Sequence, residues 1–76
     1  MDVKSKFGKR VRELRLSSGY SQEAFSLQCG LDRTYIASLE NGKRNISLQN
    51  IERIACAFNL SLSDFFSSEI FEVYEH

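Results

Sequence analysis

Hydrophobic residues recur at helical spacing in five stretches of the chain. These stretches are about 3–18, 22–29, 33–41, 48–58 and 61–66. The apolar positions of the two longest are Val3, Phe7, Val11 and Leu14 in the first, and Leu48, Ile51, Ile54, Ala55 and Phe58 in the fourth. No alternating pattern of useful length predicts a strand. The pattern therefore predicts an all-α fold, a compact bundle of five short helices.

Residues with strong positional preferences mark several helix ends. Ser21 and Asp32 are N-cap residue types, and Gly30 is typical of the left-handed position that closes a helix. The stretch from Ser61 to Asp64 resembles a capping box. Gly8 lies inside the first helix at a cost of up to about 1 kcal/mol relative to alanine, so fraying is expected at its N-terminal turn.

The third helix has two different sides when its residues are placed about 100° apart around its axis. Ile36 and Leu39 fall on one side, which must face a core. The opposite arc is polar or small and consists of Arg33, Thr34, Ala37 and Ser38. A short helix of this kind fits the major groove of DNA. Together with the preceding helix and the turn at Gly30, it predicts a helix-turn-helix.

Each residue of this arc has a chemistry suited to base edges. The planar fork of Arg33 matches guanine O6 and N7, although it also suits a phosphate. Thr34 and Ser38 donate, accept or touch a thymine methyl group, and Ala37 permits close approach. Tyr35 lies at the edge of the arc, so its hydroxyl either meets the DNA backbone or its ring packs partly in the core.

A second set of polar residues is placed to hold the DNA backbone. Gln22 occupies the first position of its helix, where amide groups lack internal partners and attract phosphate. Ser47 is first an N-cap and second a candidate phosphate ligand. The other expected backbone contacts are Tyr35, Asn41, Lys43, Arg44 and Asn45.

Composition and charge fit one small DNA-binding domain. The chain has 76 residues and is 42% hydrophobic, enough for a core but not for an enclosed catalytic cleft. The formal net charge is zero. Its distribution is uneven, because residues 1–20 carry six basic and two acidic side chains whereas residues 46–76 carry one basic and five acidic. The basic end is expected to face phosphate.

Several classes of function are disfavoured. Without a nucleophile beside a base or a glycine-rich phosphate loop, the chain is not expected to be an enzyme. Cys29, Cys56 and the single His76 match no metal-ligand spacing, and we expect two buried thiols, no metal, no cofactor and no small-molecule ligand. No apolar run approaches about 20 residues, and the N-terminus lacks the apolar stretch of a signal peptide, so no membrane contact and a cytoplasmic location are expected.

With these residues in view, the chain resembles the Cro/CI (XRE-type) helix-turn-helix family over roughly residues 5–66. The residues that carry the resemblance are Arg15, Ser21-Gln22-Glu23, Phe25, Gly30, Ile36, Leu39-Glu40-Asn41-Gly42 and Ser47 to Phe58. The segment LDRTYIASLE followed by Arg44-Asn45 is most similar to the controller proteins of restriction–modification systems, which are short dimeric regulators.

The family resemblance also implies two structural details. It implies an ion pair between Arg15 and Glu40. The family usually has alanine where this chain has Ser26, and the packing there survives if the serine hydroxyl bonds back to its own helix.

A domain this small reads only a few base pairs, so specificity requires a second copy. We expect a homodimeric, sequence-specific regulator of transcription that binds double-stranded DNA at a palindromic operator, with half-sites about 34 Å apart. It would act by blocking RNA polymerase or by contacting it. The expected interface is Ile51, Phe58, Leu60, Leu62, Phe65 and Phe66, with a role confined to the core left open.

Residues 1–67 form the predicted DNA-binding domain, and residues 68–76 are a tail. In the tail, Ile70, Phe71, Val73 and Tyr74 alternate with glutamates in a way that fits a helical turn or two. They either cover the protomer's own bundle or help to build a subunit interface. The acidic, aromatic tail also motivates an alternative function, an antitoxin or protein-interaction module that captures a partner protein.

Overall fold

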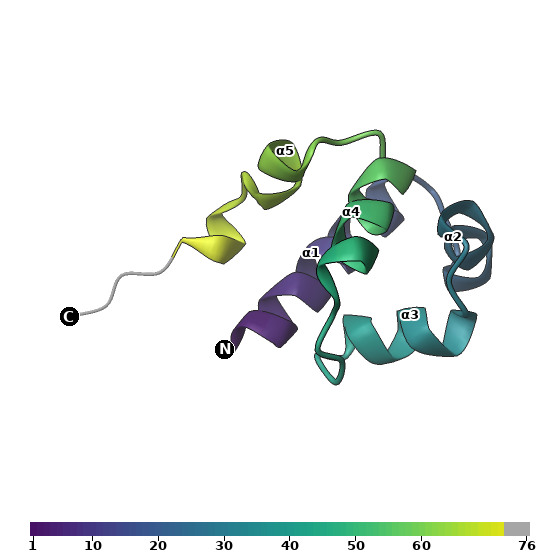
Figure 1. Cartoon of the computed structure of the whole chain (residues 1–76), viewed down its shortest axis with the longest axis horizontal. Coiled ribbons are helices and arrows are strands. Elements are labelled where there is room, and N and C mark those ends of the chain that lie inside the picture. The colour runs from purple at the N-terminus through teal and green to yellow at the C-terminus, as the bar shows by residue number, and fades with distance from the viewer. Residues whose placement is uncertain (73–76) are drawn as a thin grey trace.

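The computed structural model describes residues 1–72, which form five α-helices and a final 3-10 turn (Figure 1). The elements are α1 (Val3–Ser17), α2 (Gln22–Cys29), α3 (Arg33–Glu40), α4 (Leu48–Ala57), α5 (Leu62–Phe66) and η1 (Glu69–Phe71). No strand occurs within this part of the chain. The all-α prediction is confirmed, and the predicted bounds of α2 agree with those observed.

Helices α1 and α4 lie in the middle of the molecule, between two different ends (Figure 1). At one end, α2 packs against α3 and α4, and α3 also packs against α1. At the other end, α5 contacts α4, and η1 contacts α1. Because α1 contacts elements at both ends, it connects the helix-turn-helix to the C-terminal part of the described chain.

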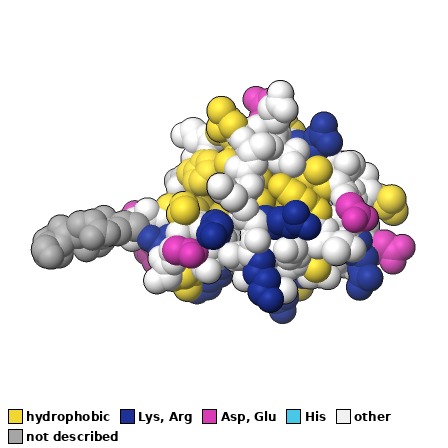
Figure 2. Space-filling model, turned by 60° about the horizontal axis from the view of Figure 1, so that its bottom comes forward, with side chains coloured by type: hydrophobic (Ala, Val, Ile, Leu, Met, Phe, Trp, Pro, Cys, Tyr) yellow, Lys and Arg dark blue, Asp and Glu magenta, His cyan; other side chains and the backbone are white. Residues whose placement is uncertain are grey.

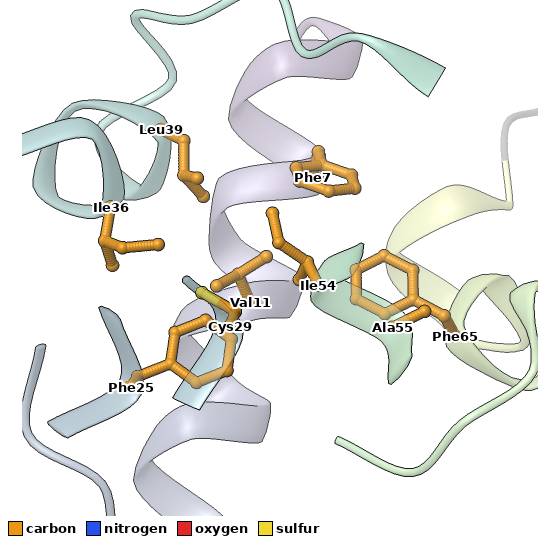
Figure 3. Packing of buried hydrophobic residues seen from close by; sticks show 9 residues of the cluster. All are labelled: Phe7, Val11, Phe25, Cys29, Ile36, Leu39, Ile54, Ala55 and Phe65. Carbon is orange, nitrogen blue, oxygen red and sulfur yellow. The ribbon is translucent and has the colours of Figure 1, made fainter. Parts of the chain in front are cut away.

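Every helix contributes a fully buried side chain to one core (Figure 3). The buried hydrophobic residues are Phe7, Val11, Phe25, Cys29, Ile36, Leu39, Ile54, Ala55 and Phe65. The rings of Phe25 and Phe58 stack with centroids 4.5 Å apart. Offset aromatic stacking adds to the free energy gained by burial, so this pair ties α2 firmly to the end of α4.

The assignment of Phe65 to a dimer interface is wrong. Its side chain is 0% exposed, and its ring lies 5.2 Å from that of Phe7 in the protomer's own core. Periodicity marks apolar positions on a helix, but it does not tell which of them face the core. The other proposed interface residues keep some exposed surface: Ile51, Phe58 and Leu60 are half-buried, and Leu62 and Phe66 are exposed.

Most of the predicted capping interactions are present. The hydroxyls of Ser21 and Ser61 accept hydrogen bonds from the third residue after each, at 3.0 Å in both cases. Gly30 has the left-handed φ of 72° expected of a helix end. Asp32 precedes α3 with an extended backbone, but its carboxylate makes no capping hydrogen bond. Ser26 is buried and its hydroxyl donates to the Glu23 carbonyl at 2.7 Å, which satisfies the condition for its packing.

Gly8 does not cause the expected fraying. Helix α1 is regular from Val3, where the Asp2 carboxylate accepts from the Ser5 amide at 2.9 Å. A Cβ at position 8 would collide with the Leu39 carbonyl oxygen and lie 2.8 Å from that of Glu40. Glycine therefore permits a close approach between α1 and the end of α3, an advantage that outweighs its low helix propensity.

The two cysteines differ, contrary to the expectation that both are buried. Cys29 is buried and Cys56 is exposed, and both are free. Burial raises the pKa of the Cys29 thiol. Residues 1–72 contain no cluster of histidine, cysteine and carboxylate side chains suited to a metal ion. None of the helices in this part of the chain has the length and apolar character needed to cross a membrane.

The described part of the predicted tail packs on its own protomer. Glu69–Phe71 forms a single 3-10 turn, and the Phe71 ring lies 4.9 Å from that of Phe66. This packing fits the expectation that the tail covers its own bundle. The remaining apolar residues of the tail, Val73 and Tyr74, lie outside the described residues.

Candidate nucleic-acid interface

Helix α3 turns its apolar side inward and leaves the opposite side open. Ile36 and Leu39 are 0% and 1% exposed. Arg33 and Thr34 are exposed, while Ala37 and Ser38 are half-buried. This difference in exposure between the two sides of α3 follows from the helical period, which places residues three and four positions apart on one face. The four predicted base-reading residues thus share one face, and no described part of the chain buries it.

Arg33 has no hydrogen-bond or ion-pair partner within residues 1–72. Its planar fork of donors is therefore available for a ligand. Helix α3 lies at the bottom of the view in Figure 1, and Figure 2 turns this side toward the reader. Lys and Arg side chains are spread over the face seen there. A free arginine at the first turn of an exposed helix is suited to contact either a base edge or a phosphate.

Of the two alternatives for Tyr35, the structure shows the partial core packing, and contact of its hydroxyl with the DNA backbone stays a prediction. Its ring packs partly against the core, and its hydroxyl accepts a hydrogen bond from the Asn50 side-chain amide at 3.2 Å. The Arg44 guanidinium lies 5.1 Å from the centre of the same ring, within cation–π range. Tyr35 therefore links α3, the following loop and α4, and its own O–H proton stays free to donate.

The polar turn after α3 is held close to the N-terminal helix. Asn41, Lys43, Arg44 and Asn45 are exposed there. Gly42 adopts a left-handed φ of 72°, and a Cβ on it would lie 2.6 Å from the Ser5 hydroxyl oxygen. Only glycine tolerates both this conformation and this contact. The backbone of this turn is consequently fixed beside the open face of α3.

Ser47 has the first of its two predicted roles. Its hydroxyl accepts from the Asn50 amide at 3.2 Å and caps α4. The side chain is exposed at the start of that helix. A hydroxyl oxygen that accepts one hydrogen bond can still donate its proton, so the second role as a phosphate ligand stays a prediction.

The predicted ion pair between Arg15 and Glu40 is confirmed. Arg15 donates from Nε to Oε2 at 2.6 Å and from Nη2 to Oε1 at 3.0 Å. A third hydrogen bond, from Nη1 to the Tyr20 carbonyl, measures 2.9 Å. The Glu40 side chain is only 2% exposed, and its hydrogen bonds raise the pKa of Arg15. This pair fixes the end of α3 to α1 and to the turn before α2.

Gln22 joins the same network at the start of α2. Its side-chain nitrogen donates to Glu40 Oε1 at 3.2 Å, and Arg12 lies 3.9 Å from that oxygen. Because a carboxylate only accepts hydrogen bonds, Glu40 holds the nitrogen end of the Gln22 amide toward itself. The second amide hydrogen remains for another acceptor, such as the phosphate proposed from the sequence.

Comparison with known proteins bears on this arrangement. The family model described as Helix-turn-helix matches residues 11–65, which include α2, α3 and α4. The chain belongs to the helix-turn-helix family. This family consists of DNA-binding regulators rather than enzymes. Helix α3, which carries the open polar face, lies within the matched residues.

Two curated relatives are control proteins. The chain is 48% identical over 67 residues to control protein C.MunI from Mycoplasma sp, covering 87% of this chain and 90% of the relative. It is 45% identical over 64 residues to control protein C.BamHI from Bacillus amyloliquefaciens, covering 83% and 79%. The resemblance to controller proteins inferred from the sequence is confirmed.

Solved structures agree with this assignment. The restriction–modification controller protein C.AhdI from Aeromonas hydrophila superposes with a TM-score of 0.78 at 44% identity, covering 83% of this chain and 96% of that one. The controller protein C.Esp1396I, solved as a tetramer with its natural 35 base-pair operator, gives a TM-score of 0.80 at 32% identity over 87% of each chain. The helix-turn-helix protein thus has the fold of these controller proteins.

Proposed function

We propose that this helix-turn-helix protein is a restriction–modification controller that binds a palindromic operator as a homodimer and regulates transcription there. The observation that carries the proposal is the open face of α3, where Arg33, unpartnered within residues 1–72, lies beside small and hydroxyl side chains. A relative, C.Esp1396I, has been solved on its own operator. Occupancy of the operator would block RNA polymerase or bring the regulator into contact with it, in the cytoplasm.

The contacts divide into two groups. Arg33, Thr34, Ala37 and Ser38 read base edges, with Arg33 bidentate to a guanine. The second group positions the protein on phosphates without reading sequence. It consists of Gln22, Tyr35, Asn41, Lys43, Arg44, Asn45 and Ser47.

The second copy docks on the exposed apolar residues of the C-terminal helices. Leu62 and Phe66 are 37% and 38% exposed and lie four positions apart, so they share one side of α5. Half-buried Ile51, Phe58 and Leu60 contribute the edges of this surface. A two-fold interface uses the same surface on both copies, which suits a palindromic site.

Selection of bound duplexes from a random pool, repeated at two salt concentrations, tests the proposal. We expect enrichment of a palindrome whose half-site centres lie about 34 Å apart. Affinity for every duplex should fall as salt rises, because phosphate contacts release counterions. Failure to enrich any sequence, even in dilute buffer, would contradict the assignment.

A further inference from the structure

Arg10 is turned toward α5 rather than toward solvent. Its Nε donates to the Phe65 carbonyl at 2.7 Å, and Nη2 donates to the Asp64 carbonyl at 3.1 Å. The guanidinium also lies 5.7 Å from the centre of the Phe65 ring. Although Arg10 belongs to the basic N-terminal region of the sequence, two of its three guanidinium nitrogens donate to main-chain carbonyls of its own chain.

These contacts address a weakness of α5. A helix of five residues is too short to be stable by itself. At its end the Asp64 carbonyl accepts from the Ser67 amide at 3.2 Å, whereas the Phe65 carbonyl has no main-chain donor within residues 1–72. Arg10 supplies the donor to the Phe65 carbonyl and a second donor to the Asp64 carbonyl, while its planar group lies over the Phe65 ring. A lysine has the same charge but not this fork of fixed donors. The orientation of α5 on α1 therefore depends on the arginine geometry.

The same helix that holds α5 also holds α3. Gly8 allows the last carbonyls of α3 to approach α1, and Arg15 binds Glu40 at the end of α3. Gly8, Arg10 and Arg15 lie within two turns of one helix. Helix α1 thus fixes the outward direction of Leu62 and Phe66 relative to the reading face of α3.

We propose that Arg10 is a positioning residue that sets the distance between the two reading helices, and so the half-site spacing that the dimer accepts. The proposal rests on the proposed function, in which α5 carries the dimer contact. In a two-fold dimer any change in the angle of α5 moves both reading helices at once. Loosening α5 therefore widens the range of spacings accepted and leaves recognition within each half-site unchanged.

The test compares full-length wild type with Arg10→Met and with Lys9→Met, the matched control. Lys9 is exposed on α1 and, within residues 1–72, makes no hydrogen bond or ion pair, so its substitution removes the same charge. Binding is measured on the selected operator, on versions with one base pair inserted or removed between the half-sites, and on a version with one substituted base pair inside a half-site.

We expect wild type and Lys9→Met to bind the altered spacings at least about tenfold more weakly, because one base pair shifts the second half-site both along and around the duplex. For Arg10→Met this penalty should fall to about threefold or less, while the penalty for the substituted base pair, about five- to 150-fold, is retained. If Arg10→Met does not fold, Arg10→Lys serves instead, since it keeps the charge and loses the fork.

Two results would overturn the role of Arg10: an unchanged spacing penalty in a folded Arg10 variant, or an equal loss of both penalties, which indicates general loosening of the fold. A wild-type protein that binds no sequence specifically would instead contradict the proposed function. The two failures are therefore distinguishable.

Discussion

Helices α3 and α5 are built alike on the inside and differ on the outside. Each is short and buries apolar side chains in the common core, Ile36 and Leu39 from α3 and Phe65 from α5. Outward, α3 presents small polar groups and an arginine without a partner in the described part of the chain, whereas α5 presents Leu62 and Phe66. The inner side of a helix determines where it packs, and the outer side determines its partner: in the proposed function, a DNA groove for α3 and the apolar surface of a second copy for α5.

The two helices are also held by different interactions. A buried ion pair holds the end of α3, and the free energy lost on removing one partner of such a pair is large. Two hydrogen bonds from Arg10 to main-chain carbonyls hold α5, one part-buried and one exposed, so water competes with them more than with the pair at Glu40, whose side chain is 2% exposed. The reading helix should accordingly be the more firmly positioned of the two.

The largest expected effect comes from breaking the ion pair. Arg15→Met leaves the Glu40 carboxylate, 2% exposed, without its main partner. We expect the free energy of unfolding to fall by about 3–5 kcal/mol, as measured by urea denaturation. Arg12→Met is the matched control. The Arg12 side chain is 58% exposed and lies 3.9 Å from the same carboxylate, so this change should have little effect. Equal losses in the two variants would contradict the comparison.

Gly8→Ala tests the close approach between α1 and α3, because the sign of its effect on the free energy of unfolding depends on that approach. Alanine is favoured over glycine inside a helix by about 1 kcal/mol. The added Cβ, however, would meet main-chain carbonyls of α3 that have no side-chain rotation to escape it. We expect a net destabilisation of about 1–3 kcal/mol in thermal or urea unfolding. A stabilised protein would show that α3 is not held in this way.

The apolar outer side of α5 is tested by self-association. Leu62→Ala combined with Phe66→Ala should raise the dimer dissociation constant about ten- to hundredfold in sedimentation experiments, since it removes the central apolar contacts. Leu27→Ala is the control, because Leu27 is 79% exposed on α2, away from this surface. If both variants dimerise like wild type, the interface lies elsewhere.

The smallest effects concern the thiols. Cys56 should react with a thiol reagent at the rate of an exposed group, and Cys29 should react only as the chain unfolds.

The Cys29 thiol also predicts how stability depends on pH. Because burial raises the pKa of Cys29 above its usual 9.0, this thiol ionises in the unfolded chain before it ionises in the folded one as pH rises. Its contribution to stability is therefore full below pH 9 and declines above it. A Cys29→Ala variant should lack that decline, and equal alkaline sensitivity would contradict the assignment.

The sequence predicted local features well because periodicity and capping residues act over a few positions. The helices, the left-handed Gly30 and the free face of α3 follow from such patterns. The Arg15–Glu40 pair was implied by the family resemblance, not by spacing. The sequence did not predict the fully buried state of Phe65, because periodicity assigns the same positions to a core and to an interface.

Contacts between distant parts of the chain were also missed. Arg10 binds a carbonyl 55 residues away, and Tyr35 accepts from Asn50 on another helix. The need for glycine at position 8 likewise depends on how closely the end of α3 approaches α1. No local signal marks these residues, since each depends on the three-dimensional packing of helices that are remote in sequence.

The central claim, that the outer face of α3 reads base edges, is tested most directly by one comparison of affinities. Arg33→Ala is measured on the selected operator and on a random duplex of equal length at one salt concentration. We expect a loss of about 1–3 kcal/mol on the operator and a clearly smaller loss on the random duplex. Equal losses on both would contradict base reading by Arg33.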